Sequence, residues 1–530
     1  MIGIALLLLA ASIGHALARG LRVPPIPLLM AVGFGLGLTG TLESGFLEES
    51  LVLGITFLVF AAGVELDPTR VRQQKKAAFA VGLLQFVILG ALGLGASLAL
   101  GYDLQTGAYL ALALTASSTL VAMRVLQRRR QLFEPFGRLV IGVLLLQDLF
   151  VILLIPVLTG LPDGTSAVVR GLGATLLLAG LVGPLLRALM PRVLEHLSLD
   201  EELLLLVVLA HLFGFLGLAG LLGVPMVAAA FVAGVVLSAF PVNGVVRGQL
   251  TSIGDFFTAI FFTALGASIG LPTATELVHA AIFAAVVVLV TPLVVAVVAE
   301  ATGLSARPAI VSGLLLAQTS EFSLVVGLQG VAVGHLDAGV FRIVVLVTLA
   351  TMMLTPLIVS SDRVALALLR LHPARRRRET ADPPDDHVLL LGAGWSGMQL
   401  LETLVISPHP VVVIDDDPQV VERIRTAGVE AFRGDAADPA LLSRCGLARA
   451  RVVVSTVRRP QDNESLLSRA GEVPVLVRAF EDSDAAWLAE RGATAVTFGD
   501  AAAATFLEWY DRRGWEAADD LADEELEDVL

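Results

Sequence analysis

Residues 139–159 form an apolar run that contains a single ionisable side chain, the carboxyl group of Asp148. At a rise of about 1.5 Å per residue, a helix of this length crosses the hydrocarbon core of a bilayer. A carboxylate at that depth costs several kcal/mol and usually faces a protein interior or a water-filled path for ions or protons. The run therefore predicts a transmembrane helix with an ion or proton site at Asp148. The alternative is a protonated carboxyl group hydrogen-bonded in a helix contact.

The composition of the whole chain agrees with a membrane protein. Of 530 residues, 56% are hydrophobic and 16% are charged, and the mean hydropathy is +0.82. These values exclude a soluble globular protein. Hydropathy predicts a polytopic α-helical protein with thirteen spans. The spans are expected at 2–18, 23–40, 51–66, 77–100, 106–126, 139–159, 166–186, 202–218, 224–240, 253–270, 277–299, 308–329 and 338–360.

Positive residues cluster in alternate connections, which assigns these connections to the cytoplasm. The clusters are Arg19 and Arg22; Arg70, Arg72, Lys75 and Lys76; Arg124, Arg128, Arg129, Arg130 and Arg138; Arg187 and Arg192; Arg247; Arg307; and Arg375 to Arg378. This pattern places the N-terminus outside and the C-terminus inside an inner cell membrane. A cleaved signal peptide is the alternative for residues 1–18, although no positive residue precedes that apolar stretch.

Charge and cysteine usage exclude several other classes of protein. The net charge of -13 arises largely in the last third of the chain and argues against nucleic acid as a partner. The single cysteine, Cys445, excludes a disulfide framework and a multi-cysteine metal site. Lysine occurs only at Lys75 and Lys76, so no lysine lies inside an apolar segment.

The membrane half contains an internal repeat. FLVFAAG at 57–63 is similar to IFFTALG at 260–266, TASSTLV at 115–121 is similar to TSEFSLV at 319–325, and Arg138 matches Arg342. The offsets are 203, 204 and 204 residues, and each joins a span to one seven spans later. Because an odd number of crossings reverses orientation, the repeats are expected to be inverted, as in secondary transporters. Chance similarity between apolar segments is the alternative.

Small polar residues interrupt two of the repeated spans at mid-depth. They are Thr115, Ser117, Ser118 and Thr119 in one span, and Gln318, Thr319, Ser320 and Glu321 in the other. Both spans are therefore predicted to be broken helices, which membranes tolerate only where the unwound backbone lines a cavity. The alternative is that each hydroxyl bonds back to its own helix.

These motifs together resemble the Kef-type potassium/proton antiporters of the monovalent cation:proton antiporter-2 superfamily. The similarity rests on FAAGVELDP at 60–68, LTASST at 114–119, LQDL at 146–149, GVPMVAAAFVAG at 223–234, FFTALG at 261–266 and QTSEF at 318–322. The resemblance implies a homodimer of thirteen-span subunits with a sodium/proton antiporter-like fold. In such a fold two crossed broken helices carry the ion site.

The resemblance places the ion site at Asp148, with Gln147 before it. Since no membrane lysine and no second adjacent aspartate are present, it implies electroneutral exchange of one cation for one proton. Thr115, Ser117 and Ser118 would supply oxygens to the cation. Glu321 would compensate the converging helix ends or lie closer to the ion.

A charged, proline-containing linker at 372–386 separates the membrane domain, 1–371, from a soluble domain at 387–510. The soluble domain begins with a strand at 388–391, the sequence GAGWSG at 392–397, a helix at 398–405 and a strand at 411–414 that precedes Asp415. This is GxGxxG in a strand-turn-helix context, with an acidic residue 23 positions beyond the first glycine. The candidate nucleotide-binding residues are Gly392, Gly394, Trp395, Ser396, Gly397 and Asp415. The alternative is a structural glycine-rich turn in an empty Rossmann-like fold.

Further strands are expected at 429–432, 451–456 and 473–480, which completes a doubly wound parallel sheet. The segments at 434–442 and 493–497 resemble the regulator-of-potassium-conductance domain, also called KTN or TrkA-N. That resemblance places Asp435 near the adenosine part of a regulatory nucleotide, NAD(H) or AMP. No hydride-transfer catalyst is evident, so no redox use is expected. The acidic tail at 511–530 is expected to be a surface helix or disordered.

The sequence thus predicts a nucleotide-regulated antiporter of K⁺ or Na⁺ against H⁺, and not an enzyme. The first alternative is a ligand-gated cation channel, but a selectivity filter such as TVGYG is absent from the sequence. The second is a membrane-anchored dinucleotide-dependent enzyme, which would need a catalytic acid or base and a substrate pocket. Whether an ancillary subunit or glutathione takes part is left open by the sequence.

Overall fold

The structure is a computed structural model that describes residues 2–21, 23–65, 75–129, 131–132, 134–182, 201–238, 244–360, 364–365, 367–368, 384–457, 459–497, 499–500 and 503. The chain folds into two compact units. One comprises Met1–Thr302 and Pro308–Leu369, and the other comprises Gly303–Arg307 and Arg370–Leu530. The boundaries predicted at residues 371 and 510 stay predictions, because most of the linker at 372–386 and the tail at 511–530 lie outside the described residues.

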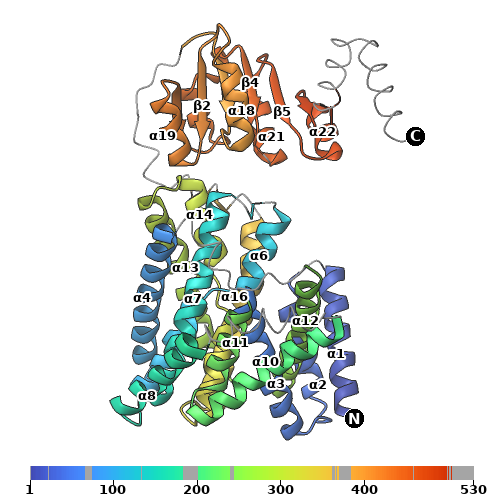
Figure 1. The fold of residues 1–530 in the computed structure, drawn as a ribbon, viewed down its shortest axis with the longest axis vertical. Coiled ribbons are helices and arrows are strands. Elements are labelled where there is room, and N and C mark those ends of the chain that lie inside the picture. Colours follow the sequence, from blue (N-terminus) through green and yellow to red (C-terminus); the bar gives the residue numbers. More distant parts are fainter. Residues whose placement is uncertain are drawn as a thin grey trace, which may run out of the picture. The chain divides into compact units, whose positions relative to one another are not determined.

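The first unit is helical (Figure 1). Its elements are α1 (Ile2–Leu21), α2 (Pro25–Gly37), α3 (Ser44–Glu65), α4 (Lys75–Ala99), α5 (Leu104–Thr115), α6 (Thr119–Arg128), α7 (Pro135–Gly160), α8 (Thr165–Leu177) with the π-helix η1 (Leu178–Val182), α10 (Glu201–Leu222), α11 (Met226–Ser238), α12 (Gly244–Ser268), α13 (Ala274–Ala301), α14 (Ala306–Leu316), α15 (Glu321–Ala332) and α16 (Ala338–Ser360). Within the described residues, each of the thirteen predicted spans overlaps helical structure.

Within the described residues, nine segments are long and apolar enough to cross a membrane. Four shorter apolar helices, at Pro25–Gly37, Thr165–Gly180, Met226–Ser238 and Ile253–Ser268, occupy the remaining predicted spans. A helical membrane region is therefore confirmed, while the count of thirteen crossings stays a prediction. The orientation also stays a prediction, since much of the positive charge behind it, at 66–74, 183–200 and 369–383, lies outside the described residues.

Helices α3 and α11 pack backbone against backbone at two glycines. A Cβ atom at Gly63 would overlap the carbonyl oxygen of Phe231, and a Cβ atom at Gly234 would overlap the carbonyl oxygen of Phe60. Small residues allow this close approach, which is a common way of packing membrane helices where hydrophobic burial gives little driving force.

Helices α2 and α12 make the corresponding contact. A Cβ atom at Gly266 would overlap the carbonyl oxygen of Met30, and one at Gly33 would overlap that of Thr263. Gly63 and Gly266 are the glycines that end the two similar stretches 57–63 and 260–266. The same tight contact thus occurs twice at the offset of the internal repeat. The repeat therefore extends to packing, and its inversion stays a prediction.

The second unit contains a parallel six-stranded sheet with the order β3-β2-β1-β4-β5-β6. The strands are β1 (Val388–Leu391), β2 (Val411–Asp415), β3 (Glu430–Arg433), β4 (Val452–Ser455), β5 (Val475–Arg478) and β6 (Thr494–Val496). The helical elements are α18 (Trp395–Leu404), α19 (Pro418–Thr426), α20 (Pro439–Arg444), the 3₁₀-helix η3 (Leu447–Arg449), α21 (Pro460–Ala470) and α22 (Asp482–Ala489).

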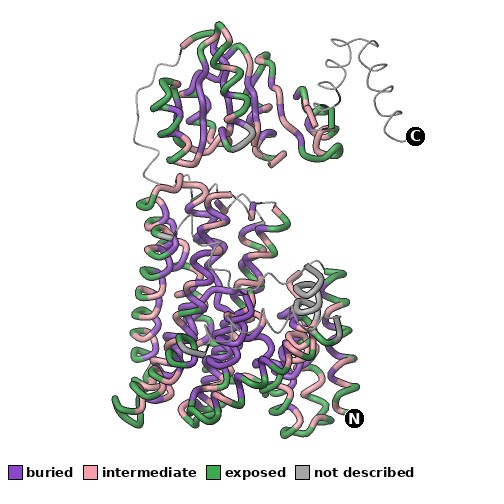
Figure 2. The backbone as a smooth tube through the Cα atoms, in the orientation of Figure 1, coloured by how far each residue is buried: buried purple, intermediate pink, exposed green. Residues whose placement is uncertain are grey.

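Both faces of this sheet are covered. In β1, Val388 and Leu390 belong to one apolar cluster with residues of α18 and α19, whereas Leu389 and Leu391 belong to another with residues of α20, α21 and α22. Figure 2 shows the central strands β1 and β2 as buried. A strand buried on both faces consists of continuous apolar residues, which explains why VLLL lacks alternation. The predicted doubly wound domain is confirmed, and β6 is a strand beyond those predicted.

Candidate functional site

Both predicted helix interruptions are present. Helix α5 ends at Thr115 and α6 begins at Thr119, while the backbone at Ala116 and Ser118 is extended. Helix α14 ends at Leu316 and α15 begins at Glu321. Each break is buried, so its free backbone groups need partners inside the protein.

The two breaks contact each other directly. The Ser117 hydroxyl donates to the carbonyl of Leu316 over 2.8 Å, and Nε2 of Gln318 donates to the carbonyl of Ser118 over 3.4 Å. Segments about 200 residues apart in the sequence therefore form one polar junction inside an apolar helical unit.

Asp148 lies on α7 beside this junction. It is 4% exposed, and its Oδ2 accepts a hydrogen bond of 3.2 Å from the Thr119 hydroxyl at the start of α6. Among the residues that the structure describes, none hydrogen-bonds to Oδ1. A buried carboxylate with one oxygen free of protein donors can bind a proton or a cation there.

A second buried carboxylate, Glu321, is the first residue of α15. It is 5% exposed and interacts electrostatically with Asp148. The Ser118 side chain and the Leu120 backbone at the start of α6 interact electrostatically with its carboxylate. Glu321 thus contacts the N-terminal ends of two short helices, where negative charge is favoured. This position agrees with the expectation that it compensates the helix ends.

The predicted oxygen donors are engaged within the junction. The Thr115 hydroxyl donates to the carbonyl of Leu112 in its own helix, over 2.7 Å. Ser117 donates to Leu316, and the Ser118 hydroxyl accepts from the backbone of Val121, over 3.3 Å, as the N-cap of α6. Oε1 of Gln147 accepts from the backbone N–H of Ser117 over 3.0 Å. The roles of these residues as ion ligands stay predictions.

Thr119 is a site residue that sequence reasoning did not select. It is one of the small polar residues that predicted the break, but it was not assigned to the ion site, although its hydroxyl reaches Asp148. The feature that could have indicated Thr119 is its position as the first residue of the helix after the break. At that position its side chain has different neighbours from those of the extended residues Ala116 and Ser118.

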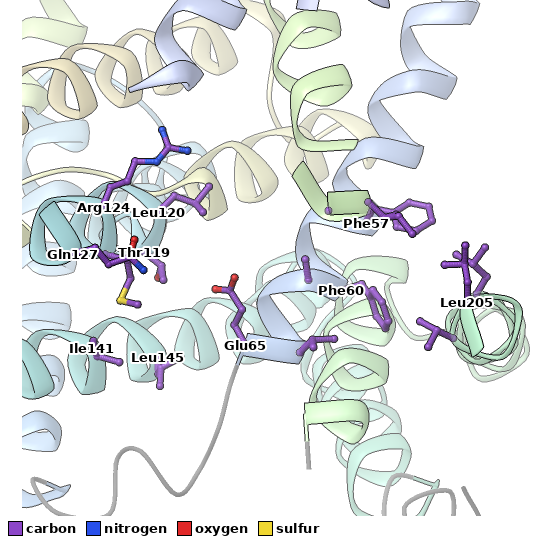
Figure 3. A pocket seen from close by; sticks show the side chains of 17 residues that line it. Phe57, Phe60, Glu65, Thr119, Leu120, Arg124, Gln127, Ile141, Leu145 and Leu205 are labelled. Atoms are coloured by element: carbon purple, nitrogen blue, oxygen red, sulfur yellow. The ribbon is translucent and has the colours of Figure 1, made fainter. Parts of the chain in front are cut away.

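A cavity of about 300 Å³ reaches Thr119. Residues of α3, α6, α7, α10 and α12 line it, including Phe57, Glu65, Thr119, Arg124 and Gln127. Figure 3 shows the Glu65 carboxylate directed into this space, on the side that faces Thr119. Glu65 also interacts electrostatically with Asp148. The cavity therefore provides a partly polar approach to the donor of Asp148.

The glycine-rich turn of the second unit fits the predicted phosphate-binding geometry. Gly392 has φ of +81°, a conformation that favours glycine, and a Cβ atom at Gly397 would overlap the carbonyl oxygen of Gly392. A Cβ atom at Gly394, by contrast, would meet nothing within 4 Å. Open space at the N-cap of α18 is where a pyrophosphate approaches the backbone. The backbone of Trp395 and Ser396 forms the first turn of α18, and their side chains lie outside the described residues.

Asp415 ends β2 and is tied to the same turn. Its Oδ2 accepts from the backbone N–H of Ala393 over 2.6 Å, and its Oδ1 accepts from that of Asp417 over 2.8 Å. Desolvation raises the pKa of this carboxyl group, although the backbone donors oppose the shift. Asp415 is 8% exposed and accepts two backbone hydrogen bonds, so it supports the loop, and its predicted role as an acceptor for the ribose hydroxyls of a nucleotide stays a prediction.

Asp435 lies just beyond β3, the neighbour of β2. Its Oδ1 accepts from the backbone N–H of Ala437 over 2.9 Å, and Gly434 before it donates to the carbonyl of Asp415 over 2.9 Å. The turn after β1, Asp415 and Asp435 therefore meet at the carboxyl edge of the sheet. Chain order reverses there between β1 and β4, which is where open α/β sheets bind ligands.

Comparisons with known proteins agree with this architecture. Residues 4–361 match the family described as sodium/hydrogen exchanger, transmembrane, and residues 388–499 match the TrkA-N domain. YbaL of Escherichia coli K12, named as a candidate cation/proton antiporter, is 27% identical over 93% of this chain and 94% of its own length.

Two further similarities cover parts of the chain. The glutathione-regulated potassium-efflux system protein KefC of Escherichia coli K12 is 28% identical over 79% of this chain and 69% of its own length. The crystal structure of the YbaL TrkA-N domain from Escherichia coli is 30% identical, with a TM-score of 0.23, over 24% of this chain and 97% of that one. On the family matches, the chain belongs to the sodium/hydrogen exchanger family of transmembrane proteins and carries a C-terminal TrkA-N domain.

Proposed function

We propose that this protein exchanges a monovalent cation, K⁺ ahead of Na⁺, for protons, with Asp148 as the binding group that the two share. The observation that carries the proposal is the buried carboxylate at the junction of two helix breaks, with one oxygen free of donors among the described residues. Membership of the exchanger family supports ion exchange. The preference for K⁺ follows the name of the relative KefC.

Exchange at Asp148 couples two fluxes by simple electrostatics. Burial disfavours the charged form of a carboxyl group, so a proton and a cation compete for it. Either occupant neutralises the carboxylate, and the loaded carrier can then cross the low-dielectric barrier. The empty, charged carrier cannot, which prevents a leak of either ion.

Glu321 keeps a constant charge in this scheme. Glu321 lies at the N-terminal end of α15, where a negative charge is favoured, and in this scheme it does not exchange its occupant. Asp148 is then the group that changes its occupant, and no lysine of the chain lies within the described helices beyond the start of α4. One cation moves for one proton, so exchange is electroneutral.

The cavity beside Thr119 serves as the cytoplasmic approach. Glu65, which lines it, is the last residue of α3, and the following segment carries Arg70 and Arg72, the charges that assign that end of α3 to the cytoplasm.

The TrkA-N domain regulates transport by binding a nucleotide, NAD(H) or AMP, without redox chemistry. Support comes from the glycine-rich turn, whose middle glycine, Gly394, borders open space at the N-terminus of α18. The domain lies in the cytoplasm, and the protein is a homodimer of the inner membrane, as the Kef-type resemblance implies.

Asp148→Asn tests the transport site. Because asparagine cannot exchange a proton, cation-dependent proton movement in proteoliposomes should fall to the level of empty liposomes. Asp163→Asn, in the exposed connection after α7, makes the same chemical change away from the site and should transport normally. Both variants should elute and melt as the unmodified protein does. Normal exchange by the folded Asp148→Asn variant would reject the assignment.

A further inference from the structure

Each helix break leaves a backbone N–H that its own helix does not bond. In the first break this group belongs to Ser117, and in the second it belongs to Thr319. Both residues are 1% exposed, so bulk water does not hydrogen-bond to these two N–H groups. An unpaired N–H at bilayer depth is strongly unfavourable.

The Ser117 N–H donates to Oε1 of Gln147 on α7 over 3.0 Å. Gln147 is fully buried and directly precedes Asp148, whose Oδ2 accepts from Thr119. Two consecutive residues of α7 therefore hold the two ends of the unwound segment, one through its backbone and the other through a hydroxyl.

The Thr319 N–H donates to Oγ1 of Thr351 on α16 over 3.1 Å. The Thr351 hydroxyl itself donates to the carbonyl of Val347 over 2.8 Å, which leaves an oxygen lone pair directed at the break. Thr348 differs, because its Oγ1 meets the side-chain hydroxyl of Thr319, over 3.1 Å, and not the backbone N–H.

Gln147 and Thr351 occupy corresponding places in the internal repeat. They are 204 residues apart, as are Arg138 and Arg342, and each lies on the helix that comes after a broken span: α7 after α5 and α6, and α16 after α14 and α15. The side chains differ in chemistry but offer the same group, an oxygen that accepts a backbone hydrogen bond. The repeat offset relates the two acceptors but not their donors, because Ser117 aligns with Glu321 and Thr319 aligns with Thr115 in the repeated stretches.

We propose that Gln147 and Thr351 are paired positioning residues that hold the two unwound segments in register, and that Gln147 acts through the backbone of Ser117 and not as a ligand of the transported cation. Only the consequence of these contacts, a correctly placed Asp148, rests on the proposed function. The hydrogen bonds themselves are independent of transport.

Hydrogen exchange of the full-length protein in lipid nanodiscs tests the two contacts, with fragmentation to resolve single amides. Gln147→Met, which keeps the volume but removes the acceptor, should speed exchange at Ser117 by about tenfold or more and leave Thr319 unchanged. Thr351→Val should do the reverse. Thr351→Ser keeps the hydroxyl, so the Thr319 amide should exchange hydrogen as slowly as in the unmodified protein. Thr348→Val is the matched control and should leave the Thr319 amide protected.

Transport kinetics separate a positioning role from a ligand role. Gln147→Met and Thr351→Val should both raise the cation KM about tenfold, whereas a ligand role would confine that effect to Gln147. If Gln147→Met does not fold, Gln147→Asn provides the measurement, since its shorter side chain no longer reaches Ser117. Unchanged protection of Ser117 in the folded variants would overturn the proposal. The hydrogen-exchange measurement should be repeated on Asp148→Asn, where the same protection of Ser117 and Thr319 is expected. This control separates failure of the positioning role from failure of the transport assignment, because it does not depend on transport.

Discussion

Thr119 is the residue that connects the cavity to the carboxylate. It lines the space of about 300 Å³ and donates to Oδ2 of Asp148 over 3.2 Å. A donor to a carboxylate stabilises its charged form relative to its protonated form. Under the proposed exchange, the hydroxyl of Thr119 would shift the competition at Asp148 away from the proton and toward the cation.

Thr119→Val should raise the apparent KM for the cation by about three- to tenfold, the loss of one hydrogen bond to a charged group. The increase should be largest at low pH, where protons compete best. Thr119→Ser retains the donor and should restore the KM. Thr56→Val provides a control, since the hydroxyl of Thr56 bonds to Val52 in its own helix. Equal KM values for Thr119→Val and the unmodified protein would contradict this role.

Asp415 links strand β2 to the glycine-rich turn through the backbone of Ala393. Asp415→Ala should therefore weaken nucleotide binding by about tenfold or more, because a carboxylate acceptor to the loop is lost. Isothermal titration calorimetry with NADH and with AMP measures the change. Glu422→Ala removes the same charge from the exposed side of α19 and should bind normally. Unchanged affinity in Asp415→Ala would refute the support role.

At the scale of elements, glycine decides which helices approach most closely. The contacts of α3 with α11 and of α2 with α12 place carbonyl oxygens where a Cβ atom would lie. These helix contacts leave no room for repacking, because the opposing atoms belong to the backbone and not to flexible side chains. These four helices therefore form a tightly joined part of the membrane unit.

Two glycines of α2 test this conclusion within one helix. Gly33→Ala should lower the thermal unfolding midpoint by about 3–8 °C, since its Cβ atom overlaps the backbone of Thr263. Gly35→Ala should change the midpoint by about 1 °C or less, because nothing lies within 4 Å of a Cβ atom there. Fluorescence-detected melting of both variants compares them directly. Similar unfolding midpoints for the two variants would show that the close contact between α2 and α12 does not limit stability.

At the scale of the whole molecule, an exchanger unit and a nucleotide-binding unit share one chain. A bound nucleotide regulates transport only if it binds two transport states of the protein with different affinity. The proposed regulation therefore predicts a change in transport rate, and also a change in nucleotide affinity when the cation is present.

Dissipation of a pH gradient in vesicles should be faster with K⁺ than with Na⁺, and NADH or AMP should change the rate at least about twofold. Asp415→Ala should keep the basal rate and lose the response to nucleotide. The same response in Asp415→Ala and the unmodified protein would place regulation outside the glycine-rich turn. Faster dissipation with Na⁺ would overturn the proposed cation preference.

Much of the architecture was predicted from local patterns in the sequence. The apolar spans, the two interrupted helices and the GxGxxG turn after β1 were all predicted correctly in position, because each depends on composition or spacing over fewer than about thirty residues. Asp148 was singled out in the same way, as one charge in an apolar run, and its role as the ion site stays a prediction.

Tertiary structure alone decided the partners of these residues. Thr119 and not Thr115 reaches Asp148, Gln147 bonds to the backbone of Ser117, and Asp415 bonds to Ala393. Glu321 joins Asp148 from a helix far along the chain. The physical reason is that a hydroxyl or amide in a helix break has several acceptors within reach. Which one it meets depends on how helices distant in the sequence pack together.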